Sequence, residues 1–150
     1  MRNDFSSLSP SSAGFAAVLA TRRLALRAIM DGRGADSVIL CVPASLAHYG
    51  GPEGRNGALL VVTAQVAHLL AGAAGKGGPE SGVGGTVQHL PRPPWLAAAE
   101  LLRRGCALGY EGSCLDADAL ALLKARLAPA RLLDLGPDIA RQVASHAGAG

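Results

Sequence analysis

The chain reads SVILCV over residues 37–42 and ALLVVT over residues 58–63, and these two stretches decide its fold class. Both are uncharged and rich in β-branched side chains, and Pro43 closes the first. Continuous apolar runs of this length are typical of strands that are covered on both faces, as in parallel sheets. The sequence therefore predicts two neighbouring strands inside one covered sheet.

Helical patterns flank and separate these strands. Residues 13–31 place their apolar side chains on one stripe about 120° wide, which predicts an amphipathic helix that Gly32 and Gly34 end. Three further helices are predicted at residues 94–104, at residues 116–127, and from the turn at residues 136–138 to His146.

The remaining segments complete the predicted sheet. Residues 86–90 and residues 131–135 are candidate third and fourth strands, whereas residues 65–71 are predicted to form a short helix after the second strand. Periodicity also leaves one continuous buried helix over residues 58–71 as an alternative. We therefore expect a small three-layer α/β domain, in which a short, mostly parallel sheet of three to four strands has helices on both faces.

Length and composition predict a single domain over residues 1–150. The chain is shorter than those that divide into several cores, and 49% of its residues are hydrophobic, which is enough for a core. Residues 1–11 are expected to be flexible, and residues 72–85 form a predicted loop because half of them are glycine. With so few aromatic residues, the chain lacks the stacking platforms that single-stranded nucleic-acid binding needs.

Charge and cysteine content limit the class of partner. The net charge of +3 comes from 14 basic and 11 acidic residues spread over both halves of the chain, so nucleic acid is not an expected partner. The longest early apolar run, residues 13–20, is too short to cross a bilayer, and no membrane contact is expected. The cysteines Cys41, Cys106 and Cys114 fit neither a disulfide framework nor a zinc ribbon, which predicts a reducing bacterial cytoplasm.

Polar residues that follow the predicted strands mark a candidate ligand site. In open α/β sheets, ligands bind beyond the carboxyl ends of the strands, where loops meet helix N-termini. The residues at these positions are Ser45, His48, Tyr49, Thr63, Gln65, His89, Asp134 and Asp138. His48 and Tyr49 are candidates for a proton donor and its hydrogen-bonding partner, with a surface histidine at a helix end as the alternative. If the strands are parallel, these side chains meet at one edge of the sheet.

Two cations indicate the charge of the ligand. Arg22 lies on the apolar stripe of the first helix, so it needs a carboxylate partner, a bound anion or a subunit interface, unless its stem snorkels to the surface. Lys76 lies in the Gly-rich loop, where backbone amides can approach an anion, although no complete phosphate-binding motif is present. We therefore hypothesise that the strand ends bind a small anionic metabolite, with no reaction specified.

A second hypothesis is a non-catalytic assembly or interaction subunit that forms a homo-oligomer. The Ala-rich helix predicted at residues 94–104 offers small side chains that can pack closely against a second copy. No close pair of cysteines points to a metal site, and the sequence identifies no cofactor. Whether the chain is an enzyme stays open between the two hypotheses.

Overall fold

The computed structural model describes residues 10–50, 58–72, 86–90, 94–112 and 116–149. The predictions of a flexible N-terminus and of a Gly-rich loop fall almost entirely on other residues, so they stay predictions. Lys76 likewise lies outside the described residues, and its proposed contact with an anion is not addressed by the structure.

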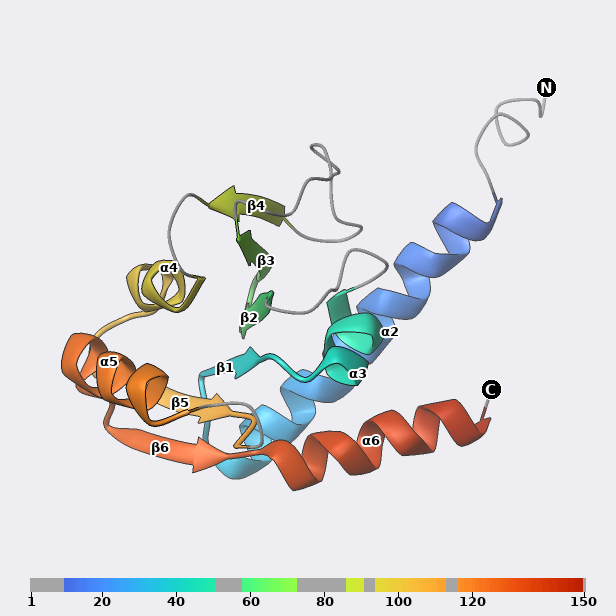
Figure 1. The fold of residues 1–150 in the computed structure, drawn as a ribbon. Coiled ribbons are helices and arrows are strands. Elements are labelled where there is room, and N and C mark those ends of the chain that lie inside the picture. Colours follow the sequence, from blue (N-terminus) through green and yellow to red (C-terminus); the bar gives the residue numbers. More distant parts are fainter. Residues whose placement is uncertain (1–9, 51–57, 73–85, 91–93, 113–115, 150) are drawn as a thin grey trace.

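One six-stranded sheet forms the centre of the molecule, in the order β4-β3-β2-β1-β5-β6 (Figure 1). Its strands are β1 (Ser37–Leu40), β2 (Leu59–Thr63), β3 (Ala67–Gly72), β4 (Thr86–Leu90), β5 (Ala107–Tyr110) and β6 (Arg131–Asp134). Strand β2 pairs antiparallel with both β1 and β3, whereas the other three neighbouring pairs are parallel. Within this sheet, β2 therefore runs against the direction that the other strands share.

The two strands that decided the fold class are neighbours, as predicted. Strands β1 and β2 pair from Ser37 opposite Thr63 to Leu40 opposite Leu60. The expectation of three to four mostly parallel strands is wrong in its detail, because the sheet has six strands and is mixed. The two strands that sequence reasoning missed are β3 and β5.

Strand β3 stands where a short helix was expected over residues 65–71. The Thr63 hydroxyl accepts hydrogen bonds from the backbone amides of Gln65 and Val66, and the Thr63 amide donates to the Val66 carbonyl. This tight turn sends the chain back along β2, so β3 finds strand partners on both sides. The backbone groups of β3 form hydrogen bonds with β2 and β4, and a helix at this position would lose these bonds between strands.

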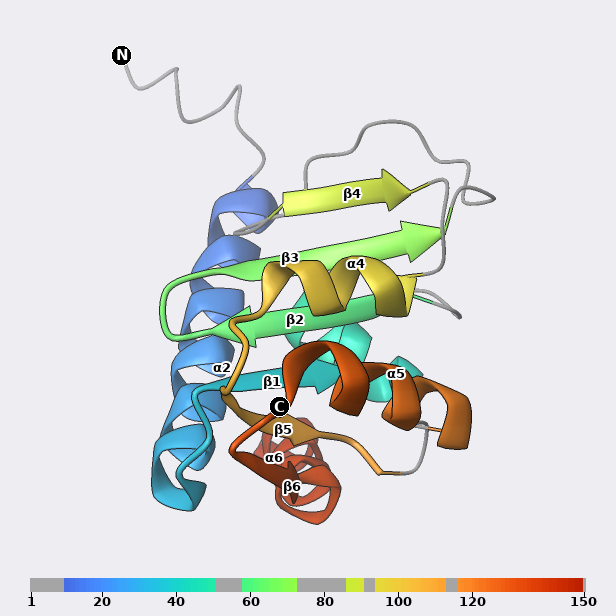
Figure 2. The ribbon, with the colours of Figure 1, turned by 90° about the vertical axis from the view of Figure 1, so that its left-hand side faces the viewer.

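Helices cover both faces of the sheet and give the three layers that the sequence predicts. On one face lie α2 (Pro10–Arg33), the short α3 (Pro43–Ser45), the π-helical turn η1 (Leu46–Gly50) and α6 (Gly136–Ala149). On the other face lie α4 (Pro94–Leu101) and α5 (Ala117–Leu127) (Figure 1, Figure 2). Because α3 and η1 follow β1 directly, they carry the polar residues at its carboxyl end.

Side chains of the central strands alternate between two apolar cores. Leu40 and Leu60 pack in the core under α2 and α6, whereas Ile39 and Leu59 pack in the core under α4 and α5. These four side chains are at most 2% exposed. Burial on both faces explains why β1 and β2 are apolar at nearly every position.

The alanines of α4 belong to the second core. Ala97, Ala98 and Ala99 are buried, and they pack in the same cluster as Leu59 of β2 and Leu123 of α5. Their small size is therefore explained by packing within the chain, which removes the observation that motivated the assembly hypothesis. A homo-oligomer stays a prediction.

The membrane and cysteine expectations have separate outcomes. No helix in the described part of the chain is long and apolar enough to cross a membrane. Cys106 is buried and free. Cys41 is disulfide-bonded, so the expectation that the cysteines take no part in a disulfide is wrong for this residue. The cytoplasmic location stays a prediction.

Candidate functional site

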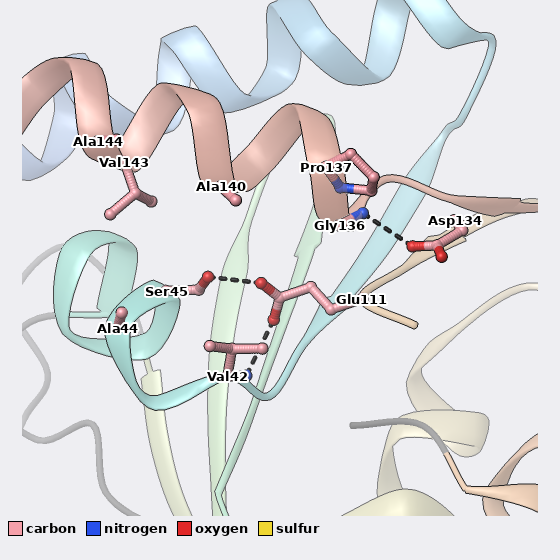
Figure 3. A pocket seen from close by; sticks show the side chains of 10 residues that line it. All are labelled: Val42, Ala44, Ser45, Glu111, Asp134, Gly136, Pro137, Ala140, Val143 and Ala144. Atoms are coloured by element: carbon pink, nitrogen blue, oxygen red, sulfur yellow. Dashed lines mark hydrogen bonds between the residues drawn. The ribbon is translucent and has the colours of Figure 1, made fainter. Parts of the chain in front are cut away.

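A pocket of about 560 Å³ opens at the carboxyl ends of β1, β5 and β6, between α3 and α6 (Figure 3). Its lining residues are Val42, Ala44, Ser45, Glu111, Asp134, Gly136, Pro137, Ala140, Val143 and Ala144. The volume is within the range of small-molecule sites in proteins. The pocket occupies the edge of the sheet at which ligands bind in open α/β folds.

Glu111 is a buried carboxylate that ties the ends of two strands together. It follows β5 and is 3% exposed. One carboxylate oxygen accepts hydrogen bonds from the backbone amides of Cys41 (2.7 Å) and Val42 (2.9 Å), and the other accepts from the Ser45 hydroxyl (2.5 Å). Ser45 and Glu111 face each other across the base of the pocket (Figure 3). The Glu111 carboxylate thus fixes the start of α3 against β5.

Asp134 plays a similar part on the other side of the pocket. It ends β6, and its Oδ1 accepts hydrogen bonds from the backbone amides of Gly112 (3.0 Å) and Gly136 (2.9 Å). A Cβ atom at Gly112 would overlap the Asp134 carboxylate, so this close approach requires a glycine. Asp134 itself is exposed, so its charge remains accessible to a ligand.

The remaining walls of the pocket are apolar. Pro137, Ala140, Val143 and Ala144 project from α6, opposite Ala44 of α3 (Figure 3). Among the lining residues, the charged side chains are the carboxylates described above, and none is a cation. The pocket therefore combines a negative end with a nonpolar wall.

His48 and Tyr49 contact α6 next to the pocket. The His48 Nε2 and His146 Nδ1 atoms are 2.7 Å apart, and the Tyr49 hydroxyl donates to Gln142 Oε1 at 2.6 Å. Burial raises the pKa of Tyr49, and the nearby Glu111 charge adds to the rise, so the phenol keeps its proton. Both η1 side chains thus hold α6 in place.

Comparison with known proteins places the fold in a family. Residues 22–142 match the profile of the creatinase/prolidase N-terminal domain. The chain belongs to this family. No match to a curated protein was found.

Solved structures share the fold of this creatinase/prolidase N-terminal domain. A proline dipeptidase from Streptococcus pneumoniae TIGR4 is 19% identical, with a TM-score of 0.65 over 80% of this chain and 95% of that chain. A prolidase from Pyrococcus horikoshii OT3 is 17% identical, with a TM-score of 0.66 over 79% of this chain and 33% of that chain. Dipeptidase PepE from Mycobacterium ulcerans is 20% identical, with a TM-score of 0.65 over 85% of this chain and 36% of that chain. The chain thus spans about a third of the latter two.

Of the site residues predicted from the sequence, Ser45 and Asp134 come together in the pocket of this creatinase/prolidase N-terminal domain. His48 and Tyr49 are 8% and 0% exposed and bind α6, so neither is a surface residue or a free ligand contact. Their assignment to a ligand is not supported by these contacts.

Arg22 does not supply positive charge to the pocket. Its Nη1 donates to the backbone carbonyl of His48 at 3.1 Å, which is a partner that sequence reasoning did not consider. The buried arginine of α2 is Arg23, which is 5% exposed and donates to the Tyr49 carbonyl at 2.7 Å. The buried stripe is therefore shifted toward Arg23, since Leu19 and Leu26 are buried as expected whereas Val18 is exposed, and both guanidinium groups hold η1 on α2.

Thr63 and Gln65 lie at the opposite edge of the sheet. Because β2 is antiparallel to β1, Thr63 at its carboxyl end pairs with Ser37 at the start of β1. With Asp36 and Arg103, these residues line a second pocket of about 300 Å³. The expectation that they share a site with Ser45 is therefore wrong.

Two other candidates do not line the pocket. His89 lies in β4, three strands away from β1, or roughly 14 Å at the usual spacing between strands. Asp138 forms ion pairs with Arg33 (2.6 Å) and Arg141. Within the described residues, no three His, Cys, Asp or Glu side chains gather as a metal site requires.

Glu111 is the pocket residue that sequence reasoning missed. It follows β5, whose four residues ALGY contain a glycine and no β-branched side chain, so the strand itself gave no signal. A Cβ atom at Gly109 would overlap the Leu135 side chain, which explains the glycine. The isolated acid after a short apolar segment was the available clue.

Proposed function

We propose that this creatinase/prolidase N-terminal domain binds short Xaa-Pro peptides in the pocket between α3 and α6. The similar structures include a proline dipeptidase and a prolidase, and these names supply the substrate class. The observation that carries the proposal is the pocket itself, in which carboxylates stand at one end of an apolar wall. Binding is assigned to this chain, and cleavage is not.

The acidic end of the pocket suits the ammonium group of a peptide. Asp134 Oδ1 is used by two backbone amides, and in the described structure no hydrogen bond occupies its second oxygen. Both oxygens of Glu111 already accept hydrogen bonds, so Glu111 contributes negative potential from a buried position. Asp134 is therefore the direct partner that we assign to the peptide's N-terminus.

The apolar wall suits a proline ring. From Gly136 to Ala144, α6 presents a wall about 12 Å long, whereas an extended dipeptide spans about 7 Å. A dipeptide with its ammonium group at Asp134 therefore places its second residue along Ala140 and Val143. Its carboxylate then lies away from both acids of the pocket.

An anionic metabolite is the weaker candidate for this pocket. The hypothesis required Arg22 or Lys76 as a counter-charge, but Arg22 binds a backbone carbonyl and does not line the pocket. An anion would approach two carboxylates, and like charges at contact distance repel each other. The negative end thus favours an amine over an anion.

Isothermal titration calorimetry with Ala-Pro and N-acetyl-Ala-Pro tests the proposal. We expect a dissociation constant near 1 mM for Ala-Pro at low salt, which corresponds to about −4 kcal/mol. Acetylation removes the ammonium charge, so we expect affinity about tenfold weaker. Equal affinity for the two peptides, or no binding of Ala-Pro, would overturn the proposal. Release of proline by this chain alone would overturn the assignment to binding only.

Matched variants locate the contact. Asp134→Asn keeps the oxygen that accepts from Gly112 and Gly136 but removes the charge, and we expect about tenfold weaker Ala-Pro binding. Asp36→Asn makes the same chemical change at the opposite edge and should leave binding unchanged. Equal effects of the two variants would show that the response is to net charge alone.

A further inference from the structure

Side chains on one face of α6 hold this helix against η1 and α2. Gln142 accepts from the Tyr49 hydroxyl and donates to the Ala25 carbonyl at 3.3 Å. One helical turn further on, His146 meets His48 at 2.7 Å. The neighbouring side of the same helix, at Ala140, Val143 and Ala144, forms the pocket wall. Breaking the contacts of α6 with η1 and α2 therefore also moves the pocket wall.

The contact between His48 and His146 depends on the protonation of both rings. A neutral imidazole has one nitrogen that donates and one that accepts, so a nitrogen-to-nitrogen hydrogen bond needs at least one unprotonated partner. When both rings are protonated, two N–H groups face each other and the bond is lost. The ring centroids are 4.9 Å apart, at which distance two imidazolium charges also repel.

The surroundings of His48 oppose its protonation. Arg22 of α2 donates to its backbone carbonyl, Tyr49 of η1 lies edge-on to its ring at 4.7 Å, and His146 faces it from α6. Burial, followed by the charges of Arg22 and His146, lowers the pKa of His48 to about 4. On the side of α3, the Glu111 carboxylate accepts hydrogen bonds from Ser45 and two backbone amides.

We propose that His48 and His146 form an acid-sensitive clasp, whose opening frees the C-terminal half of α6 from η1 and widens the pocket. Release of α6 exposes His48 to water, where it takes up the proton that burial and the charges of Arg22 and His146 oppose in the clasp. The clasp is a property of the chain without ligand. It rests on the proposed function only in the identity of the molecule that the widened pocket would bind.

The expected effect follows from linkage. In the open state the pKa of His48 returns to the ordinary histidine value of 6.5, whereas it is about 4 in the clasp. The open state thus binds the extra proton as pH falls from 6.5 toward 4, and opening becomes more favourable over that window. Between pH 7.5 and pH 5, the population of the open state should rise about 30-fold.

Amide hydrogen exchange on the full chain without peptide measures this opening. We expect protection factors, corrected for the intrinsic pH dependence of exchange, to fall about 30-fold at residues 46–50 and 141–146 between pH 7.5 and pH 5. Amides of β1 and β2 should keep much higher protection factors at both pH values, because they exchange only through global unfolding. Unchanged protection in α6 and η1 would overturn the proposal.

Variants of His48 separate a proton-controlled clasp from simple packing. In His48→Gln the amide nitrogen can donate to His146 but does not titrate, so the change in protection should shrink to about threefold. Ser145→Ala, at an exposed position next to His146, should keep the full response. A full response in His48→Gln would contradict the clasp. The imidazole nitrogen spectrum of the unmodified chain gives a second readout: titration of His48 near 6.5, with α6 still protected, would also overturn it.

Discussion

The two edges of the sheet carry polar residues of similar kinds but use them differently. At the carboxyl end of β1, the Glu111 carboxylate is buried and binds two backbone amides and a hydroxyl. At the opposite edge, Asp36 is exposed, binds Ser37 and one backbone amide, and lies 3.5 Å from Arg103. The first edge holds an acidic pocket with apolar walls, whereas the second pairs opposite charges in water.

This difference follows from strand direction and burial more than from residue type. Five strands end at the first edge. Just beyond β1, the backbone amides of Cys41 and Val42 donate to the buried Glu111 carboxylate. A carboxylate that accepts from these amides stabilises the edge and leaves a negative potential in the pocket. At the second edge, solvent screens each charge, so the same residue types contribute little.

The largest expected effect is on stability at the pocket edge. Glu111→Ala leaves two backbone amides and the Ser45 hydroxyl without their acceptor in a buried site, and we expect a loss of about 4 kcal/mol in the free energy of unfolding. Asp36→Ala, its counterpart at the opposite edge, should cost about 1 kcal/mol. Urea denaturation measures both, and equal losses would remove the distinction between the edges.

The next effect is the pH dependence of stability. The folded chain holds the pKa of His48 at about 4, below the ordinary histidine value of 6.5, so the unfolded chain binds more protons between these two pH values. Stability is full above pH 6.5 and falls as pH drops toward 4, with a loss of about 2 kcal/mol at pH 5.

Urea denaturation at pH 7.5 and pH 5 tests this sign. The His48→Gln variant keeps a nitrogen that can donate to His146 but does not titrate, so the part of the loss due to His48 should disappear. A chain that is equally stable at both pH values, or a variant with the same loss as the unmodified chain, would contradict the assignment.

A smaller effect is expected at the turn between β2 and β3. Thr63→Val removes the hydroxyl that accepts from the amides of Gln65 and Val66, and we expect a loss of about 1 kcal/mol. Since this turn lies at the opposite edge, Ala-Pro affinity should not change. Weaker peptide binding in this variant, measured by calorimetry, would indicate that the peptide binds at the edge of Thr63 and not in the pocket between α3 and α6.

The smallest effect is expected at Gln65. Its side chain is exposed, so Gln65→Ala should change the free energy of unfolding by less than about 0.5 kcal/mol. Peptide affinity should also stay the same. A clear loss of peptide affinity would mean that Gln65 belongs to the peptide site after all, although the direction of β2 puts it at the opposite edge.

Much of the fold could be predicted because its signals are local. The apolar runs of β1 and β2, the stripe of α2 and the capped start of α5, where Asp116 accepts from the Ala119 amide, are each legible in the sequence. Strands β3 and β5 are not, since one depends on a tight turn at Thr63 and the other contains Gly109 to accommodate Leu135. Both depend on contacts that form only in the assembled sheet.

The site could be predicted only in part for the same reason. Ser45 and Asp134 follow strands that share a direction, so the rule for strand ends brings them to one pocket. The rule misplaces Thr63 because the reversal of β2 is not encoded in its own residues. Glu111 was missed together with its strand, and the acidic character of the pocket was missed with it.

The most direct test of the account is methyl NMR during titration with Ala-Pro. The Val42 and Val143 methyl groups line the acidic pocket, and the Thr63 methyl group reports on the opposite edge. The account predicts saturable shifts at Val42 and Val143 with no change at Thr63. Shifts at Thr63 alone, or unchanged pocket methyls at saturating peptide, would contradict it.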